Sequence, residues 1–417
     1  MEVNSRNKKK IINDPVYGFI SIQDDLIFDL IEHSFFQRLR RIKQLGLTHL
    51  VYPGALHTRF HHAIGTMHLM YQAIEVLRSK GHEITKDEEN GALIAILLHD
   101  IGHGPYSHTL ENSIVTEINH EELSLLFMER LNFEFSGALS TSITIFKNDY
   151  PKHFLHQLVS SQLDMDRLDY LKRDSFFTGV SEGVINTDRI IKMLDVVDDE
   201  LVVEAKGIYS VEKFIIARRL MYWQVYLHKT VLSAENMLMQ VIKRAKFLAS
   251  NGEKLFATEP FKLFLENKFW KDDFGKNPVI LETFAELDDF DVFASIKIWT
   301  KSKDKVLSIL SQNLVNRQLF RNEIQNKPFS NELVADLKHK VAALYDISQA
   351  DAEYFVFSDV ARNSAYNPFN NRINILFKDG KVQDITEASD QLNIEILSKI
   401  VTKYFLCYPK HAANSGF

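Results

Sequence analysis

The chain has 417 residues, 45% of them hydrophobic and 25% charged, and a formal net charge of −6. These proportions are typical of a folded globular protein and exclude a disordered or fibrous chain. The negative charge excludes a surface that is basic throughout, as general binding of nucleic acid would require, while a local basic channel stays compatible with it. The lone Cys407 excludes an intramolecular disulfide and favours a reducing cytoplasm.

The N-terminal segment Met1–Lys10 is polar and charged, without the apolar stretch of a secretion signal. The longest apolar run ends at Leu98 and is far shorter than the roughly 18 residues of a membrane-spanning helix. We therefore expect neither export nor a membrane segment.

The chain is predicted to be mainly α. Residues 11–24 alternate apolar and polar side chains, which predicts a short hairpin. From about residue 25 to 190, apolar residues recur at helical spacing with few helix breakers. Val196–Glu204 predicts a second small hairpin, and Val211–Ser250 predicts one long helix with a polar stripe along it.

The C-terminal part is richer in Phe and Lys. Within it, Ile373–Ile385 predicts two strands that turn at Asp379 and Gly380. We place a domain boundary after residue 250, so that residues 1–250 form a helical core with short hairpins. Residues 251–417 would then form a helical extension and a small α+β lobe.

Metal-binding residue types occur in three predicted helical segments. His99 and Asp100 end the apolar run Gly91–Leu98, and glycines and a proline then stop the helix. Adjacent His and Asp residues more often cap a helix than bind a metal, so the pair alone carries little weight. The segment Thr58–His68 reads as a capped helix start that carries His61 and His62.

The third segment, Leu163–Asp174, places four polar side chains on one helix face: Asp166, Tyr170, Arg173 and Asp174. On an isolated helix, such a face is more commonly a solvated stripe of salt bridges. Taken in order, His62, His99, Asp100 and Asp166 provide two imidazoles and two carboxylates. Such a mixed set suits a divalent cation of Fe, Mn, Co, Zn, Ni or Mg.

Five ordered motifs resemble the HD superfamily of metal-dependent phosphohydrolases, and within it the deoxynucleoside triphosphate triphosphohydrolase branch of the sterile-alpha-motif and HD-domain type. The motifs are Ile12–Gly18, Phe36–Gly46, Tyr52–Ala55, His99–His108 and Asp164–Asp174. Five motifs in this order are far harder to obtain by chance than one. The resemblance implies hydrolysis of a dNTP to deoxynucleoside and inorganic triphosphate, with one divalent ion on the four ligands and Mg accompanying the substrate.

The same resemblance implies four catalytic residues. His108 is expected to be the general acid, and His103 to contact phosphate. His120 with Glu111, where the family usually has Asp, is expected to orient the acid group. Histidine suits proton donation near pH 7. Four other histidines could as easily be structural: His49, His57, His68 and His228.

A substrate-binding set also follows from the resemblance. Four cations are candidates to neutralise the phosphates: Arg59, Arg167, Arg218 and Lys229. Gln44 and Asp174 match contacts to the 3′-hydroxyl, and Tyr170 and Tyr226 match the aromatic wall that favours deoxyribose. Each has a plainer interpretation, as a surface cation or as a tyrosine packed in an amphipathic core. Tyr222 stands where the family has His.

Regulated members of the family bind a second, activating nucleotide between subunits. Four residues match that site: Glu32, which replaces Asp, and Gln37, Arg40 and Arg317. An ordinary salt-bridged helix surface is an equal interpretation. The resemblance also implies a homodimer or homotetramer. His61 stands where the family has Glu, so alignment alone selects His62 as the first ligand.

Two other functions stay open on this evidence. Another HD phosphohydrolase, a nucleotidase or phosphodiesterase, would keep the metal site and release a different product. A nucleotide-sensing or nucleic-acid-binding protein with weak catalysis would keep the fold. The complete ligand set and the three nearby histidines argue against the second.

Overall fold

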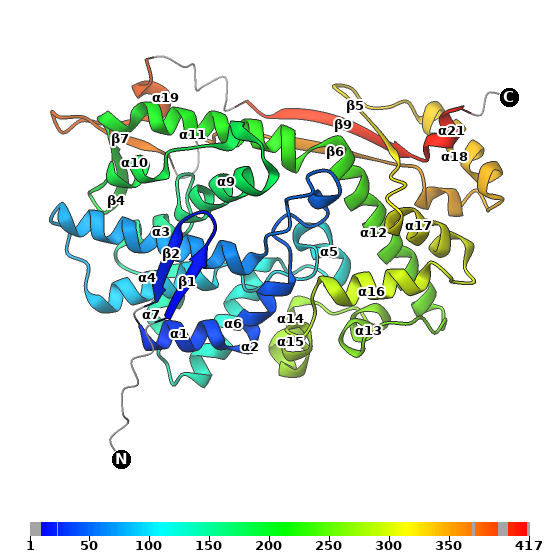
Figure 1. Ribbon diagram of the computed structural model, residues 1–417, viewed down its shortest axis with the longest axis horizontal. Helices are drawn as coiled ribbons and strands as arrows, with labels where there is room; N and C mark the ends of the chain where they lie inside the picture. The colour runs from blue at the N-terminus through cyan, green and yellow to red at the C-terminus, as the bar shows by residue number, and fades with distance from the viewer. Residues whose placement is uncertain (1–9, 23, 369–371, 391–398, 415–417) are drawn as a thin grey trace.

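The computed structural model describes residues 10–22, 24–368, 372–390 and 399–414 (Figure 1). Helices form most of it, and small sheets lie at the N-terminus, beside the helical core and in the C-terminal part. The predicted fold class is therefore confirmed. In the described part of the chain, no helix is both long and apolar enough to span a membrane.

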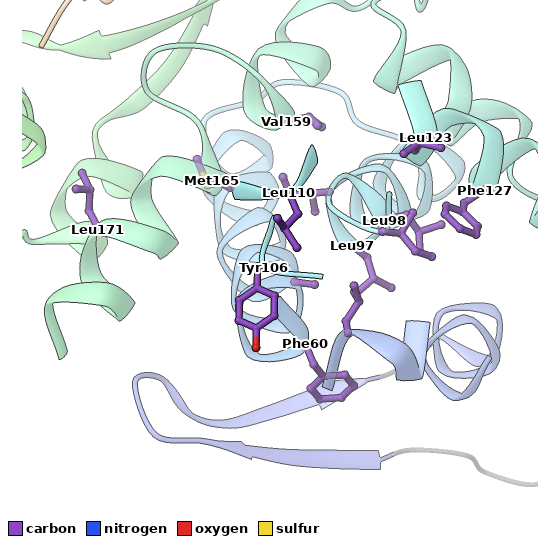
Figure 2. Close-up of a cluster of buried hydrophobic side chains, with 14 of the residues drawn as sticks. Phe60, Leu97, Leu98, Tyr106, Leu110, Leu123, Phe127, Val159, Met165 and Leu171 are labelled. Carbon is purple, nitrogen blue, oxygen red and sulfur yellow. The ribbon is translucent and has the colours of Figure 1, made fainter. Parts of the chain in front are cut away.

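The core is built around α3 (Arg59–Ser79) and α4 (Lys86–Leu98), with α9 (Met165–Thr178) packed against α3. Helix α4 starts at a capping box, in which Glu88 N donates to Thr85 Oγ1 at 3.2 Å and Thr85 N donates to Glu88 Oε2 at 2.8 Å. Its second half is buried on every side, because that half is apolar all round. Figure 2 shows Leu97 and Leu98 of α4 in the same cluster as Phe60 of α3.

Shorter helices surround this core. They are α1 (Asp25–Glu32), α2 (Ser34–Gln37), α5 (Glu111–Ile114), α6 (His120–Glu134), α7 (Ser140–Phe146), α8 (His153–Val159) and α10 (Thr187–Lys192). Single 3-10 turns connect several of them: η1 (Arg38–Arg41), η2 (Thr48–Leu50), η3 (Ser107–Thr109), η4 (Ser181–Gly183) and η5 (Ala205–Gly207).

Both predicted hairpins are confirmed. Strand β1 (Lys10–Asp14) pairs antiparallel with β2 (Gly18–Ile22), and β3 (Leu194–Val197) pairs antiparallel with β4 (Glu200–Glu204). The second hairpin turns at Asp198 and Asp199, whose φ angles are 51° and 63°. Aspartate tolerates this left-handed conformation better than most residues, which is why the pair forms a tight turn.

The predicted single helix over Val211–Ser250 is wrong. Helix α11 (Ile208–Met221) passes into a π-helical turn, η6 (Tyr222–Tyr226), and α12 (Lys229–Ser250) then begins anew. His228 caps α12, since its Nδ1 accepts from Thr230 N at 3.2 Å. The apolar periodicity is similar on both sides of the break and therefore conceals it. Within the π turn, Tyr226 contacts α9, where its Oη donates to Asp174 Oδ2 at 2.8 Å.

The C-terminal helices are α13 (Glu259–Glu266), α14 (Lys271–Lys276), α15 (Pro278–Phe284), α16 (Asp289–Trp299), α17 (Lys305–Val315), α18 (Asn331–Tyr345), α19 (Ile385–Ala388) and α21 (Lys410–Asn414), with a 3-10 turn η7 (Asp351–Tyr354). A long antiparallel sheet has the strand order β5 (Arg321–Gln325), β9 (Val401–Tyr408), β6 (Phe357–Asn363). Figure 1 shows these strands beside α12.

The two strands predicted around Asp379 and Gly380 are confirmed as β7 (Asn374–Leu376) and β8 (Val382–Asp384). Strand β7 also pairs in parallel with β4, which makes one sheet of order β3-β4-β7-β8. This sheet joins residues from both sides of position 250. The division of the chain at that position stays a prediction.

Candidate metal and substrate site

Helices α3, α4 and α9 bring three potential ligands to one point. The ligand atoms of His62, His99 and Asp166 lie within 4.8 Å of one another. His62 Nε2 is 3.1 Å from Asp166 Oδ1, and His99 Nε2 is 3.6 Å from the same oxygen. Asp100 lies beside them, with Oδ1 3.4 Å from His99 Nε2 and Oδ2 3.7 Å from His62 Nε2. All four predicted metal ligands are therefore neighbours.

Second hydrogen bonds orient both imidazoles. His62 Nδ1 lies 2.7 Å from Asp169 Oδ2, and His99 Nδ1 lies 2.6 Å from the carbonyl oxygen of Ile96. Because these oxygens accept, each Nδ1 carries a hydrogen, so the neutral form of each ring would offer its Nε2 lone pair to a metal ion. The two Nε2 atoms are buried and face the carboxylate oxygens of Asp100 and Asp166. This donor set fits a divalent cation.

The charges around His62 support the same conclusion. Burial disfavours its protonated form, but Asp166 and Asp169 outweigh that effect and raise the pKa of His62 to about 10. The two histidines in turn hold the pKa of Asp166 well below its usual range, against the effect of burial. Without a cation, His62 therefore stays protonated between the carboxylates of Asp166 and Asp169. A divalent cation would take the place of that proton.

His61 does not belong to this cluster. Its Nδ1 accepts from Thr58 N at 3.2 Å and lies 3.0 Å from Thr58 Oγ1, which closes a capping box at the start of α3. Adjacent residues of a helix point about 100° apart, so only one of the pair can face α9. The geometry selects His62.

Asp169 is a buried partner of the site that sequence reasoning missed. Arg173 donates to it from Nε and Nη2, both at 2.9 Å, and from Nη1 to Asp14 Oδ2 at 2.7 Å. Burial opposes ionisation of Asp169, yet Arg173 lowers its pKa to about 2. A chain of buried charges thus connects the hairpin β1–β2 to His62. The spacing of three residues from Asp166 on one helix was the available signal.

Two of the predicted catalytic histidines, His103 and His120, lie next to Asp100. His103 Nε2 is 3.4 Å from Asp100 Oδ1, and the His103 and His120 rings stack with centroids 3.9 Å apart. Glu111 Oε1 lies 2.7 Å from His120 Nδ1 and accepts from His120 N at 2.6 Å. Burial and the nearby Arg59 hold the pKa of His103 well below its usual range. The expected His120–Glu111 pair is present.

Gly102 allows the loop after α4 to approach α6 closely. A Cβ at this position would lie 2.2 Å from the carbonyl oxygen of His120 and 2.3 Å from Ser124 N. The same loop leads to η3, which contains His108. The side chain of His108 lies outside the described part of the structure, so its role as general acid stays a prediction.

A cavity of about 610 Å³ adjoins both clusters, and three predicted phosphate-binding arginines line it. Arg59 pairs with Asp100 and donates from Nε to Ser107 Oγ at 2.8 Å. Arg167 pairs with Asp164, and Arg218 donates to the carbonyl oxygen of Ala365 at 3.4 Å. Lys229 is not among the lining residues. It is exposed at the start of α12, and the π turn Tyr222–Tyr226 interrupts the helical spacing between Arg218 and Lys229.

The predicted sugar contacts line the same cavity: Gln44, Tyr170, Asp174 and Tyr226. Tyr226 Oη donates to Asp174 Oδ2 at 2.8 Å, and His57 Nε2 lies 2.8 Å from Asp174 Oδ1. Gln44 Oε1 is buried and accepts no hydrogen bond from any described residue. His57 thus positions a site carboxylate. Nothing in its sequence surroundings distinguishes it from a structural histidine.

The predicted regulatory residues make local contacts within the chain. Arg40 Nε donates to Gln37 Oε1 at 2.8 Å, and its guanidinium lies 3.5 Å from the centre of the Phe60 ring. Glu32 pairs with Lys10 at 2.7 Å, and Arg317 Nε donates to the carbonyl oxygen of Leu50 at 2.7 Å. These contacts leave the second nucleotide site a prediction.

Comparison with known proteins identifies two family regions. Residues 59–172 match the HD domain, and residues 185–257 match the HD associated region. An uncharacterised protein of Bacillus subtilis, YwfO, is 30% identical over 424 residues, which cover 98% of this chain and 94% of that protein. The SAMHD1 homologue of Dictyostelium discoideum, a deoxynucleoside triphosphate triphosphohydrolase, is 32% identical over 66% of this chain and 57% of its own length.

Solved structures share the whole fold. The crystal structure of a phosphohydrolase from Bacteroides thetaiotaomicron has a TM-score of 0.93 and 53% sequence identity, and the match covers 96% of this chain and 100% of that one. A hypothetical protein from Aquifex aeolicus has a TM-score of 0.69 and 26% identity, over 97% of both chains.

Proposed function

Because this chain belongs to the HD-domain phosphohydrolase family, we propose that it hydrolyses deoxynucleoside triphosphates to a deoxynucleoside and inorganic triphosphate. The observation that carries this proposal is one cavity whose lining combines three arginines and the carboxylate of Asp174 with Asp100 and Asp166 of the candidate metal site. Several cations suit a triphosphate, and a carboxylate suits a sugar hydroxyl. The name of the Dictyostelium relative supports the same substrate class.

His62, His99, Asp100 and Asp166 would hold the divalent cation. Fe, Mn, Co, Zn and Ni all suit two imidazoles with two carboxylates, and Mg suits the triphosphate of the substrate. When bound, such a cation supplies Lewis-acid activation of water and of phosphate oxygens.

Side chains of the protein would bind the phosphates and supply the proton for the leaving group. Arg59, Arg167 and Arg218 bind phosphate oxygens and offset the negative charge that grows as water attacks the α-phosphorus. The bond from phosphorus to the 5′-oxygen breaks, and this oxygen needs a proton. We assign that proton to His108, and to Glu111 the orientation of His120 through the 2.7 Å contact.

The sugar is held by a fixed polar group and an aromatic wall. Asp174 is oriented by both His57 and Tyr226, so that it can accept from a 3′-hydroxyl. The Tyr170 and Tyr226 rings meet edge to face, with centroids 6.1 Å apart. We propose that this wall leaves no room for a 2′-hydroxyl, which would favour deoxyribose.

The direct test is to incubate the protein with each dNTP and NTP plus Mn, Mg, Co or Fe and to separate the products by chromatography. Phosphorus NMR of the dGTP reaction should show triphosphate as the first phosphate product. Orthophosphate or pyrophosphate in its place would identify another HD phosphohydrolase. Absence of turnover, together with oligonucleotide binding that weakens steeply with salt, would favour a nucleic-acid-binding protein.

Regulation, assembly and location extend the proposal. An activating nucleotide at Glu32, Gln37, Arg40 and Arg317 predicts that the rate of dTTP hydrolysis rises when a suitable second nucleotide is added, which is tested by adding each NTP and dNTP in turn. A homodimer or homotetramer predicts a mass two or four times that of the chain in light scattering. We also propose a cytoplasmic location, in keeping with the lone cysteine.

A further inference from the structure

One face of α12 lines the substrate cavity with four residues at helical spacing: Leu232, Glu235, Asn236 and Met239. Glu235 is the acidic member of this set. It forms no ion pair with any residue that the structure describes, and its carboxylate accepts a hydrogen bond from Thr109. Burial raises the pKa of Glu235 to about 7, although the bond from Thr109 lowers it. The cavity therefore contains a carboxylate without a cationic partner.

The position of this carboxylate relates it to the nucleoside. A Cβ placed on Gly46 would lie 3.7 Å from Glu235 Oε1 and 3.9 Å from Thr109 Oγ1. Glu235 therefore meets the turn Gln44–Gly46, whose first residue is a proposed sugar contact. The proposed phosphate ligands, in contrast, are arginines, and a carboxylate next to phosphate would repel it. A group with N–H donors is the part of the substrate that gains from Glu235.

We infer that Glu235 reads the base of the substrate and favours guanine, an inference that rests on the proposed function. Guanine presents N1–H and its 2-amino group side by side, and a carboxylate can accept from both. Adenine and cytosine place a ring nitrogen acceptor beside their amino group. Thymine flanks its single N–H with two carbonyl oxygens. In these three bases, an acceptor would face the carboxylate and repel its ionised form, which predominates above the pKa of about 7.

The variant Glu235→Gln tests the inference, because it keeps the shape and replaces one acceptor by a donor. Loss of a hydrogen bond to a charged group predicts a fall of roughly 10- to 100-fold in kcat/KM for dGTP relative to dTTP. Glu253→Gln is the matched control: the same change on an exposed residue just beyond α12, expected to leave the dGTP to dTTP ratio unchanged. Equal effects on all four dNTPs, or no effect on any, would overturn the assignment.

Glu235→Asp is a second variant in case Glu235→Gln does not fold. It retains the carboxylate but shortens the side chain by one methylene group. We expect this variant to keep a reduced preference for guanine. Complete loss of dGTP turnover with intact dTTP turnover would also support recognition of guanine by Glu235. Thermal denaturation establishes that each variant is folded before its rates are compared. The inference is overturned if folded Glu235→Asp and Glu235→Gln proteins both keep the dGTP to dTTP ratio of kcat/KM of the original chain.

Binding without turnover separates this inference from the proposed function. Calorimetry with deoxyguanosine and with thymidine measures base recognition when no phosphate is present. If the chain hydrolyses no dNTP but binds deoxyguanosine more tightly than thymidine, and Glu235→Gln removes the difference, only the proposed reaction fails. If dNTPs are hydrolysed to triphosphate and the guanine preference is absent or survives Glu235→Gln, only the inference fails.

Discussion

Asp166 lies where the two imidazoles of the candidate metal site converge. Both His62 and His99 direct Nε2 at its Oδ1, at 3.1 and 3.6 Å. We expect Asp166→Ala to lose bound metal and hydrolysis together, because the two imidazoles and Asp100 alone leave a ligand site incomplete. Elemental analysis of the purified variant and a rate assay measure the two losses. Full metal occupancy with undiminished hydrolysis would contradict the assignment, and Asp188→Ala, an exposed aspartate on α10, is the control.

The proton donor can be distinguished from a ligand by measuring metal content. A general acid contributes roughly 10²- to 10⁴-fold to a rate. We therefore expect His108→Ala to reduce turnover by a factor in that range while metal content and dNTP binding stay nearly intact. His68→Ala should do much less, since His68 belongs to neither of the two His/Asp clusters, and the centre of its ring lies 5.4 Å from that of Tyr17. Equal activity of the two variants would transfer the acid role to His103 or His120.

Among the structural elements, the hairpin β1–β2 is connected to the metal ligands through buried charge. Asp14 pairs with Arg173, both are buried, and Arg173 holds Asp169 against His62. Asp14→Asn keeps the acceptor Oδ1 that binds Val16 N at 2.9 Å, so the substitution removes mainly the charge.

We expect Asp14→Asn to lower the free energy of unfolding by about 3 kcal/mol, as breaking a buried ion pair does. Metal affinity should fall as well, because Asp169 and His62 lose part of their support. Chemical denaturation and metal titration measure the two effects. Lys10→Ala breaks an exposed ion pair of the same hairpin and should cost less than about 1 kcal/mol. If the two variants had the same free energy of unfolding, the buried ion pair of Asp14 and Arg173 would not stabilise the fold more than the exposed pair does.

Across the whole molecule, the proposed ion would bridge three helices of one continuous core. A ligand that binds only the folded state stabilises it, by about 2.7 kcal/mol at a hundredfold excess over Kd. We expect a chelator to lower Tm and added Mn to restore it. Asp166→Ala should show no metal-dependent shift in Tm. A Tm that is identical with chelator and with Mn in the unaltered chain would contradict a structural contribution of the ion.

Local patterns were enough for a large part of this molecule. Hairpins at both predicted places, a helical core between them, and the strand pair around Asp379 and Gly380 depend on turn residues and on periodicity within a few positions. The four candidate ligands and their order could also be predicted, because imidazoles and carboxylates are common ligands of divalent cations in many folds. The substrate residues were predicted from motifs, which grouped Lys229 with the arginines although it does not line the cavity.

Tertiary structure decided which side chains serve the site and which do not. His62 and Asp169 are 107 positions apart in the chain, and His57 and Asp174 are 117 apart. The break between α11 and α12, the exclusion of His61, and the entry of Glu235 into the cavity likewise depend on packing between elements. A sequence pattern records the periodicity of one element, whereas these features depend on how elements far apart in sequence meet. Only the folded chain specifies that geometry.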